Sequence, residues 1–165
     1  MALCRIYLIT YKRNNLLTRA MQSLIGQTIT DWVCEVHNDG PADSFPGQYV
    51  QALNDDRFVM KDHAANYGAV KSFNLAFTAP GNEKYAGLLE DDNWWAPTFL
   101  EEMLQALEDS STEIAVCNER VWLENADGSW TNTGNTIWPE TSGQELFAYR
   151  YTDNCGAAKI CNSAM

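Results

Sequence analysis

"KYAGLLEDDNWWAPTFLEEM" (residues 84–103) passes from a short apolar run into three consecutive acids, and then into two tryptophans and a helix-like segment. The acids are Glu90, Asp91 and Asp92. Two carboxylates held about 4 to 5 Å apart repel by roughly 3 to 4 kcal/mol at an effective dielectric constant near 20, so a fixed cluster needs protons, solvent or a cation. The stretch therefore predicts either a solvated turn or a metal site where a hydrophobic strand ends.

Strand-like and helix-like patterns alternate along the chain around this stretch. Apolar runs that end in polar residues predict strands over residues 3–10, 31–40, 57–61 and 84–89. Helices are predicted over residues 16–25, 46–54, 66–77 and 97–107. Such alternation implies parallel strands joined by right-handed helical crossovers. We therefore predict an α/β fold, a three-layer α/β/α Rossmann-like sandwich with a mainly parallel sheet.

Two of the predicted helices carry finer expectations. Asn14 or Asn15 is expected to cap the first helix, and Gly26 to end it. In the helix over residues 66–77, a buried face is predicted for Val70, Phe73 and Phe77.

The last third of the chain is predicted to be mainly β. Residues 113–123 read as one long strand, and Asp127-Gly128 predicts a hairpin turn into the next strand. A short helix near residues 143–149 and a strand over residues 155–161 are expected to follow. We treat the whole chain, residues 1–165, as a single domain, because this length supports one core but not two.

Composition and charge exclude several classes of protein. No apolar run approaches the roughly 18 residues that cross a bilayer, and the start has no signal-peptide pattern, so we expect a cytoplasmic location without a transmembrane segment. A net charge of −11 argues against nucleic acid or an anionic membrane as a partner. The five cysteines contain no C-x-x-C pair, which predicts neither a disulfide framework nor a zinc site.

The predicted topology brings four polar clusters to one edge of the sheet, because ligands of such sheets lie beyond the carboxyl ends of the strands. The clusters are residues 10–13, 38–40, 66–68 and 90–93. Hard cations such as Mg²⁺ or Mn²⁺ prefer oxygen ligands and commonly bridge one or two carboxylates to substrate phosphates. Arg13 can bind phosphate in a bidentate fashion. These residue types favour a diphosphate ligand, although the sequence has no P-loop and no G-x-G-x-x-G.

Four motifs in order resemble a known family. "YLITYKRNNLLTRAMQSLIGQTITDWVCEVHNDGPAD" (residues 7–43) is similar to the opening of family 2 glycosyltransferases of the GT-A fold. "NYGAVKSFNLAF" (residues 66–77) resembles the family's Asn-x-Gly segment, and "LLEDDNWWAP" (residues 88–97) resembles its Asp-x-Asp-type metal motif. The match extends over residues 5–100, so residues 1–110 are identified as the nucleotide-sugar-binding half.

The resemblance implies a role for each matching residue. Asp92 would hold Mn²⁺ or Mg²⁺ on the donor diphosphate, and Asp91 would contact the ribose or the metal's water shell. Asp39 would bind the base. The remaining residues of the implied nucleotide-sugar site are Thr10, Tyr11, Arg13, Asn66, Gly68 and Lys71.

The implied reaction moves a sugar from a nucleotide-diphosphate-sugar, most often a UDP-sugar, to a hydroxyl of a saccharide or other acceptor, usually with inversion. In the family the catalytic base lies downstream of a strand that "YTDNCGAAKICNSAM" (residues 151–165) resembles. We therefore expect residues 111–165 to be a partial acceptor-side half, with the catalytic base unknown and the sequence truncated before it. An apolar edge left open in this way would favour self-association.

Three alternatives stay open at this point. The chain could be a non-catalytic nucleotide- or carbohydrate-binding module, an incomplete fragment without turnover, or a nucleotidyltransferase, which normally opens with a Gly- and Arg-rich loop. The tryptophans also have two readings. Packing on the following helix is expected for Trp94 and Trp95, and cross-strand packing for Trp122, Trp130 and Trp138, rather than a sugar platform or an acceptor groove.

Overall fold

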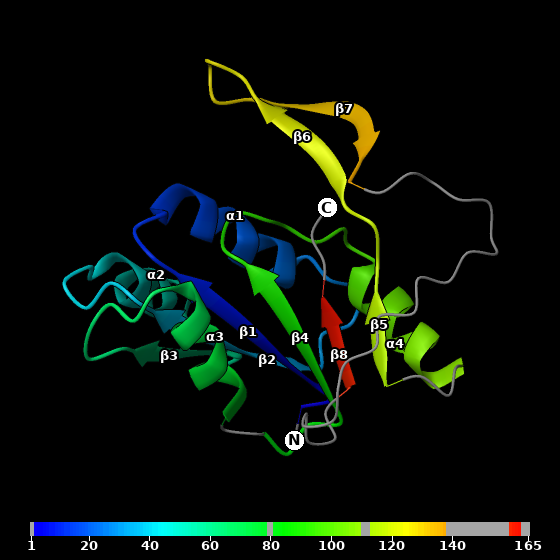
Figure 1. The fold of residues 1–165 in the computed structure, drawn as a ribbon, viewed down its shortest axis with the longest axis horizontal. Coiled ribbons are helices and arrows are strands. Elements are labelled where there is room, and N and C mark those ends of the chain that lie inside the picture. Colours follow the sequence, from blue (N-terminus) through cyan, green and yellow to red (C-terminus); the bar gives the residue numbers. More distant parts are fainter. Residues whose placement is uncertain (1, 79–80, 110–112, 138–158, 163–165) are drawn as a thin grey trace.

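The computed structural model describes residues 2–78, 81–109, 113–137 and 159–162 (Figure 1). Six strands form one sheet in the order β3-β2-β1-β4-β8-β5, and all of its neighbouring strands run parallel. These strands are β1 (Cys4–Thr10), β2 (Trp32–Asn38), β3 (Phe58–Asp62), β4 (Tyr85–Glu90), β5 (Ile114–Val116) and β8 (Lys159–Asn162). A separate antiparallel hairpin pairs β6 (Arg120–Glu124) with β7 (Trp130–Thr136).

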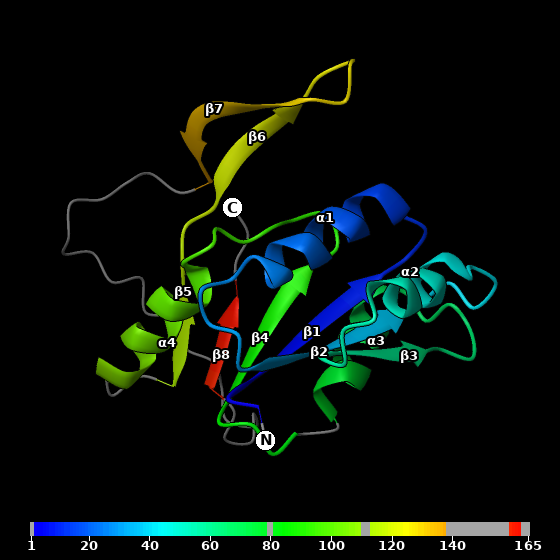
Figure 2. The same ribbon diagram turned by 180° about the vertical axis from the view of Figure 1, so that it is seen from behind.

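Four helices complete the fold: α1 (Asn14–Ile25), α2 (Phe45–Leu53), α3 (Ala69–Thr78) and α4 (Phe99–Asp109). Residues of α1 and α4 share the main hydrophobic core with one face of the sheet, while α3 packs on the opposite face (Figures 1 and 2). The alternation of β1 decides this division, because Ile6 and Leu8 belong to the main core and Tyr7 to the smaller cluster under α3. The predicted three-layer α/β sandwich is thereby confirmed. Among the described residues, no helix has the length and hydrophobicity that crossing a membrane requires.

The prediction of one long strand over residues 113–123 was wrong. The chain leaves the main sheet after Val116 and enters the hairpin at Arg120. Between them, the Asn118 Oδ1 accepts the backbone N–H of Glu119 at 2.9 Å, which is a local bond that competes with a continued strand ladder. The apolar runs of residues 114–117 and 121–123 flank three polar residues, Asn118, Glu119 and Arg120, and the chain passes from one sheet to the other at this polar interruption.

Two expectations about helices also need correction. Arg13, rather than Asn14 or Asn15, occupies the N-cap position of α1, without a side-chain capping bond. On α3 the predicted apolar face is not buried: Val70 is 78% exposed, and the buried residues are Ser72 and Ala76. Small side chains allow α3 to approach the sheet closely, which explains why they replace the large ones on its inner face.

The hairpin turn at Asp127-Gly128 is confirmed. Gly128 has a φ of +80°, which glycine adopts without strain, and the Asp127 side chain accepts the Ser129 N–H at 2.9 Å. The expected helix at 143–149 lies outside the described residues. The expected strand at 155–161 overlaps β8, and its first four residues lie outside them too.

Gln27 fixes the start of α4 against the end of α1. Its buried amide donates to the carbonyls of Ser23 at 3.0 Å and Ala96 at 2.7 Å, and its Oε1 accepts the Leu100 N–H at 2.9 Å. The backbone N–H of Thr28 also donates to the Pro97 carbonyl at 2.8 Å. These bonds determine where the segment after β4, and therefore its acidic cluster, is held.

We predict that Gln27→Ala lowers the free energy of unfolding by about 1–3 kcal/mol, because it leaves a buried N–H and a buried carbonyl unpaired. Urea denaturation measures this loss. Gln22→Ala is the matched control, because the Gln22 amide bonds the Tyr49 hydroxyl at an exposed position. Equal losses in the two variants would contradict the role given to Gln27.

Candidate functional site

The strand register places three of the four predicted polar clusters side by side. Thr10 at the end of β1 is paired with Asn38 at the end of β2, and Ile9 is paired with Glu90 at the end of β4. The fourth cluster, at the start of α3, is tied to the edge because the Gly68 N–H donates to Asp39 at 2.8 Å. The topology thus gathers residues that are up to 80 positions apart in the chain.

A single arginine joins the two aspartates that follow β4. Arg13 Nη1 lies 3.2 Å from Asp91 Oδ1 and 2.5 Å from Asp92 Oδ2. The Asp91 side chain is only 8% exposed, whereas those of Asp92 and Arg13 are 42% and 51% exposed. Burial raises the pKa of Asp91, and the neighbouring Arg13 charge opposes that rise. The guanidinium therefore supplies the cation that the acidic stretch requires.

The loop between β1 and α1 contributes a backbone N–H group as well as side chains to the surroundings of Asp91. Lys12 has a φ of +56°, an uncommon conformation for a residue other than glycine. The preceding Tyr11 N–H points to Asp91 Oδ2 at 3.4 Å, and the Tyr11 ring is 44% exposed. Thr10 is buried. Of the predicted residues in this loop, Tyr11 and Arg13 therefore reach solvent at the edge of the sheet.

Glu90, the first acid of the cluster, is bonded by Asn93. Burial raises its pKa, and the charges of Asp92, Glu119 and Asp91 raise it further. Its Oε2 accepts a hydrogen bond from Asn93 Nδ2 at 3.1 Å. Four carboxylates thus gather at this edge, and one of them, Glu119, was not singled out from the sequence.

Asp39 is an anchor for the loop before α3. Its Oδ1 accepts bonds from His63 Nδ1 at 2.9 Å and from the Tyr67 N–H at 2.8 Å, while Oδ2 accepts the Gly68 N–H. The residue is 2% exposed. Burial alone would raise the pKa of Asp39, but the bonds from His63 and the two backbone amides outweigh burial and lower it.

The two histidines were missed as contributors to the site. His63 Nε2 lies 3.2 Å from His37 Nδ1, and His37 Nε2 lies 3.3 Å from Glu35 Oε2. A buried chain of polar groups therefore runs from Glu35 along β2 to Asp39. The signal in the sequence was weak: His37 lies two residues before Asp39, and His63 directly follows the end of β3.

The remaining predicted residues shape the loops. Asn38 Nδ2 donates to the Asp43 carbonyl and to Asp62 Oδ1, and Asn38 Oδ1 accepts the Gly40 N–H at 2.9 Å. Asn66 accepts the Gly68 N–H at 2.9 Å, and Gly68 has a φ of +73°. Lys71 Nζ lies 3.8 Å from the centre of the Tyr67 ring. The predicted donor-site residues therefore lie on the loops that meet at this edge, except Thr10 at the end of β1 and Lys71 in the first turn of α3.

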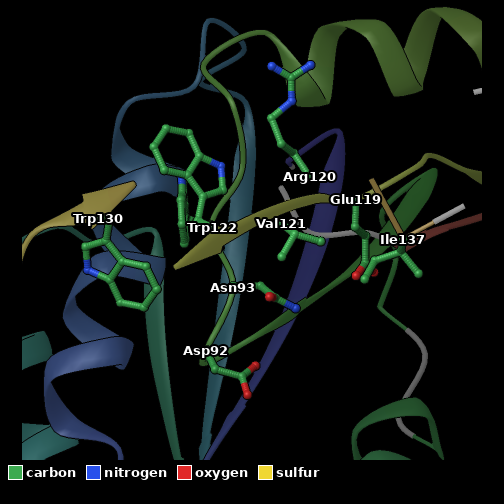
Figure 3. A pocket seen from close by; sticks show the side chains of 9 residues that line it. Asp92, Asn93, Glu119, Arg120, Val121, Trp122, Trp130 and Ile137 are labelled. Carbon is green, nitrogen blue, oxygen red and sulfur yellow. The ribbon is translucent and has the colours of Figure 1, made fainter. Parts of the chain in front are cut away.

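A tryptophan cluster forms the wall of a pocket next to the acids. The ring centre of Trp94 lies 5.5 Å from that of Trp122 and 5.6 Å from that of Trp130. The pocket of about 190 Å³ has these two hairpin rings on one side and Glu119 and Ile137 on the other, with Asp92 and Asn93 beside it (Figure 3).

The cluster corrects one expectation and refines another. Trp95 packs on Phe99 of α4 at 4.3 Å, as predicted, but Trp94 turns to the hairpin instead. The two hairpin tryptophans contact Trp94, and their strand partners are Asn132 and Glu124. Trp138 lies outside the described residues.

The carboxylates fit a hard divalent cation. Asp91 and Asp92 lie close enough together for one cationic side chain to contact both, which is the arrangement that a bridging cation would use. Within the described part of the chain, no group of three or more His, Cys, Asp or Glu residues could hold a metal by itself. A cation held by these two carboxylates would complete its shell with water and substrate oxygens, which is the usual mode for Mg²⁺.

Comparison with known proteins agrees with this geometry. The family model for Glycosyl transferase family 2 matches residues 6–164. The chain therefore belongs to glycosyl transferase family 2, and the predicted resemblance is confirmed.

One curated relative is the Escherichia coli (strain K12) protein named "Putative colanic acid biosynthesis glycosyl transferase WcaA". It is 32% identical over 93 residues, which are 56% of this chain and 33% of that protein.

Solved structures show the same fold. Staphylococcus aureus TarS 1–349 in complex with UDP has a TM-score of 0.63 at 16% identity, covering 73% of this chain and 36% of that one. The mannosyltransferase PcManGT from Pyrobaculum calidifontis, in complex with GDP-Man and Mn²⁺, has a TM-score of 0.60 at 15% identity, covering 71% and 36%. Both are GT-A glycosyltransferases. The chain spans about a third of the length of these relatives.

We predict that Asp39→Asn destabilises the protein at neutral pH by about 1–3 kcal/mol, because an amide cannot accept all three bonds. The pKa of Asp39 is lowered in the folded state, so its stabilisation is present above the unfolded pKa near 3.9 and is lost as pH falls through the folded value. The difference in the free energy of unfolding between wild type and variant should therefore become smaller below about pH 4.

Urea denaturation across this pH range measures this difference. Asp127→Asn, in the exposed hairpin turn, is the control and should change stability little. If Asp39→Asn lowers the free energy of unfolding equally at all pH values, the carboxylate charge is not what holds the loop.

Proposed function

We propose that this protein transfers a sugar from a nucleotide-diphosphate-sugar donor to a hydroxyl of a saccharide or other acceptor. The observation that carries the proposal is the Arg13–Asp91–Asp92 group at the carboxyl edge of a GT-A sheet. Membership of glycosyl transferase family 2 supports the reaction class. It also makes a nucleotidyltransferase the weaker choice.

The donor site is assigned to the loops at the ends of β1, β2 and β4. Tyr11 is exposed beside Asp91 and offers its ring to a nucleobase or ribose. Arg13 offers its guanidinium to the diphosphate and would exchange its bond to Asp92 for phosphate oxygens, which it can bind in pairs. UDP-sugars are the first donors to test, because the resemblance described above favours uracil.

The role of Asp39 in base recognition is indirect in this proposal. Both carboxylate oxygens already accept bonds from His63 and from the loop before α3. Asp39 thus holds Tyr67 and Gly68 in place, and these residues border the donor site together with Asn66 and Lys71. The base would then meet the loop that Asp39 positions.

Asp92 and Asp91 would hold Mn²⁺ or Mg²⁺. A divalent cation bound there neutralises the developing charge of the leaving diphosphate. Arg13 contributes electrostatically as well, because it lies next to both acids and can stabilise phosphate charge once it exchanges its bond to Asp92 for phosphate oxygens.

Transfer with inversion requires that the acceptor oxygen bonds to the sugar carbon as the bond to the diphosphate breaks, with the electron pair going to the leaving phosphate oxygen. A carboxylate must take the acceptor proton. The pocket between Asp92 and the hairpin is the place we assign to the acceptor, since it opens beside the proposed cation site and has aromatic walls. Donor binding is the step that the described residues support most directly.

We predict that Asp92→Asn abolishes metal-dependent nucleotide binding while changing stability by no more than about 0.5 kcal/mol, because Asp92 is an exposed strand-end acid. Calorimetric titration of UDP, GDP and dTDP, with Mn²⁺ and with a chelator, measures the binding. Asp109→Asn, at the end of α4, is the matched control and should bind as the wild type does.

An unchanged Mn²⁺-dependent affinity for nucleotide in Asp92→Asn would contradict the assignment of Asp92 as a ligand of the cation. No binding of any nucleotide to the wild-type chain would favour a binding module for another ligand.

A further inference from the structure

Arg19 on α1 lies between two tryptophans from distant segments. Its guanidinium carbon is 4.1 Å from the ring centre of Trp94 and 4.1 Å from that of Trp130. Its Nη2 donates to the backbone carbonyl of Asp92 at 2.6 Å. One side chain therefore contacts the acidic turn after β4 and the β6–β7 hairpin at the same time.

The environment of Arg19 is unusual for a charged group. Its Nε and Nη1 atoms are buried and have no hydrogen-bond partner in the described part of the chain. Burial lowers its pKa, while the charges of Glu124 and Asp92 oppose this. The guanidinium is thus stabilised mainly by two aromatic faces, an interaction that arginine makes and that lysine cannot reproduce with the same planar geometry.

The hairpin depends on such contacts. The strands β6 and β7 form a two-stranded sheet of their own and project from the main sheet (Figure 1). An isolated hairpin of two strands is at best marginally stable in water. The Trp94, Trp122 and Trp130 contacts therefore supply a docking surface, and Arg19 lies inside it.

The bond to the Asp92 carbonyl links this cluster to the acids. A peptide unit that is fixed by a 2.6 Å hydrogen bond limits the rotation of the residue that carries it. Asp92 lines the pocket together with Trp122 and Trp130 of the hairpin (Figure 3). Holding both elements from one residue of α1 fixes their separation.

We propose that Arg19 is a positioning residue that sets the Asp92 backbone and holds the β6–β7 hairpin over the pocket next to it. The effect on nucleotide binding rests on the proposed function, in which Asp92 holds the cation of the donor. The effect on the Asp92 turn and on the β6–β7 hairpin does not rest on the proposed function, because it follows from the contacts of Arg19 alone.

The test compares Arg19→Lys with Arg57→Lys. Arg57 is a matched control, because its guanidinium carbon lies 4.0 Å from the Trp32 ring and it bonds Asp55. Amide hydrogen exchange of residues 90–95 and 120–136 is measured in both variants and in the wild type. The amides of Asn93 and Trp95 are suitable probes, since both are hydrogen-bonded.

In Arg19→Lys we expect exchange in both segments to speed up by about tenfold, because the change weakens the desolvated cation–π contacts with Trp94 and Trp130. We expect the affinity for UDP with Mn²⁺ to fall by about tenfold, with no change in affinity in the presence of a chelator. Arg57→Lys should alter neither measurement. A merely structural role for Arg19 would lower thermal stability in both variants without the metal-dependent loss.

The proposal would be overturned if both segments of Arg19→Lys exchanged at the same rates as in the wild type. It would also be overturned if exchange became faster in the hairpin alone. If the wild-type protein binds no UDP with Mn²⁺, the proposed function fails, and the exchange data still decide the role of Arg19. If Arg19→Lys does not fold, Trp130→Ala removes one of the two stacked rings from the exposed hairpin and should loosen residues 90–95 as well as the hairpin. Unchanged exchange of residues 90–95 in that variant would contradict the proposal.

Discussion

The repulsion between carboxylates at the end of β4 is the constraint on which the rest of this edge depends. Asp91 is buried and Asp92 is half-exposed, and Arg13 from the neighbouring strand end is the cation that contacts both. This ion pair requires β1 and β4 to be adjacent and parallel, and it requires α1 to begin immediately after the Lys12 turn. Because the arginine can also bind phosphate, the contact that stabilises the acids is suited to exchange with a donor diphosphate.

The other strand ends are fixed by different means. Asp39 is held by His63 and two backbone amides, so its charge orders the loop before α3 instead of facing open solvent. Arg19 and Gln27, both on or next to α1, reach across to the segment after β4 from two sides. The first helix thus anchors the acidic turn through a cation–π stack and a buried amide. The carboxylates of this turn repel one another, so neighbouring residues hold the turn in place and contacts among the acids do not.

The fold and the position of the four polar clusters at one edge of the sheet could be predicted from the sequence, because both follow from local patterns: strand and helix periods, and polar residues at strand ends. What it did not reveal depended on contacts between distant segments. The break at residues 117–119 separates two apolar runs that belong to different sheets, and the inner face of α3 uses Ser72 and Ala76 where periodicity favoured Val70 and Phe77. The roles of His63, Arg19 and Trp94 arise from tertiary neighbours that no spacing in the chain indicates.

The central element of the proposed function is a divalent cation at Asp92, on the edge where β1, β2 and β4 end. Paramagnetic broadening of backbone amide signals by Mn²⁺, recorded by NMR with UDP present, locates the cation directly. The proposed site predicts that broadening is strongest at residues 91–93 and extends to residues 11–13 across the sheet edge. Broadening centred on the acidic face of α4, or spread evenly over the acidic surface, would contradict it.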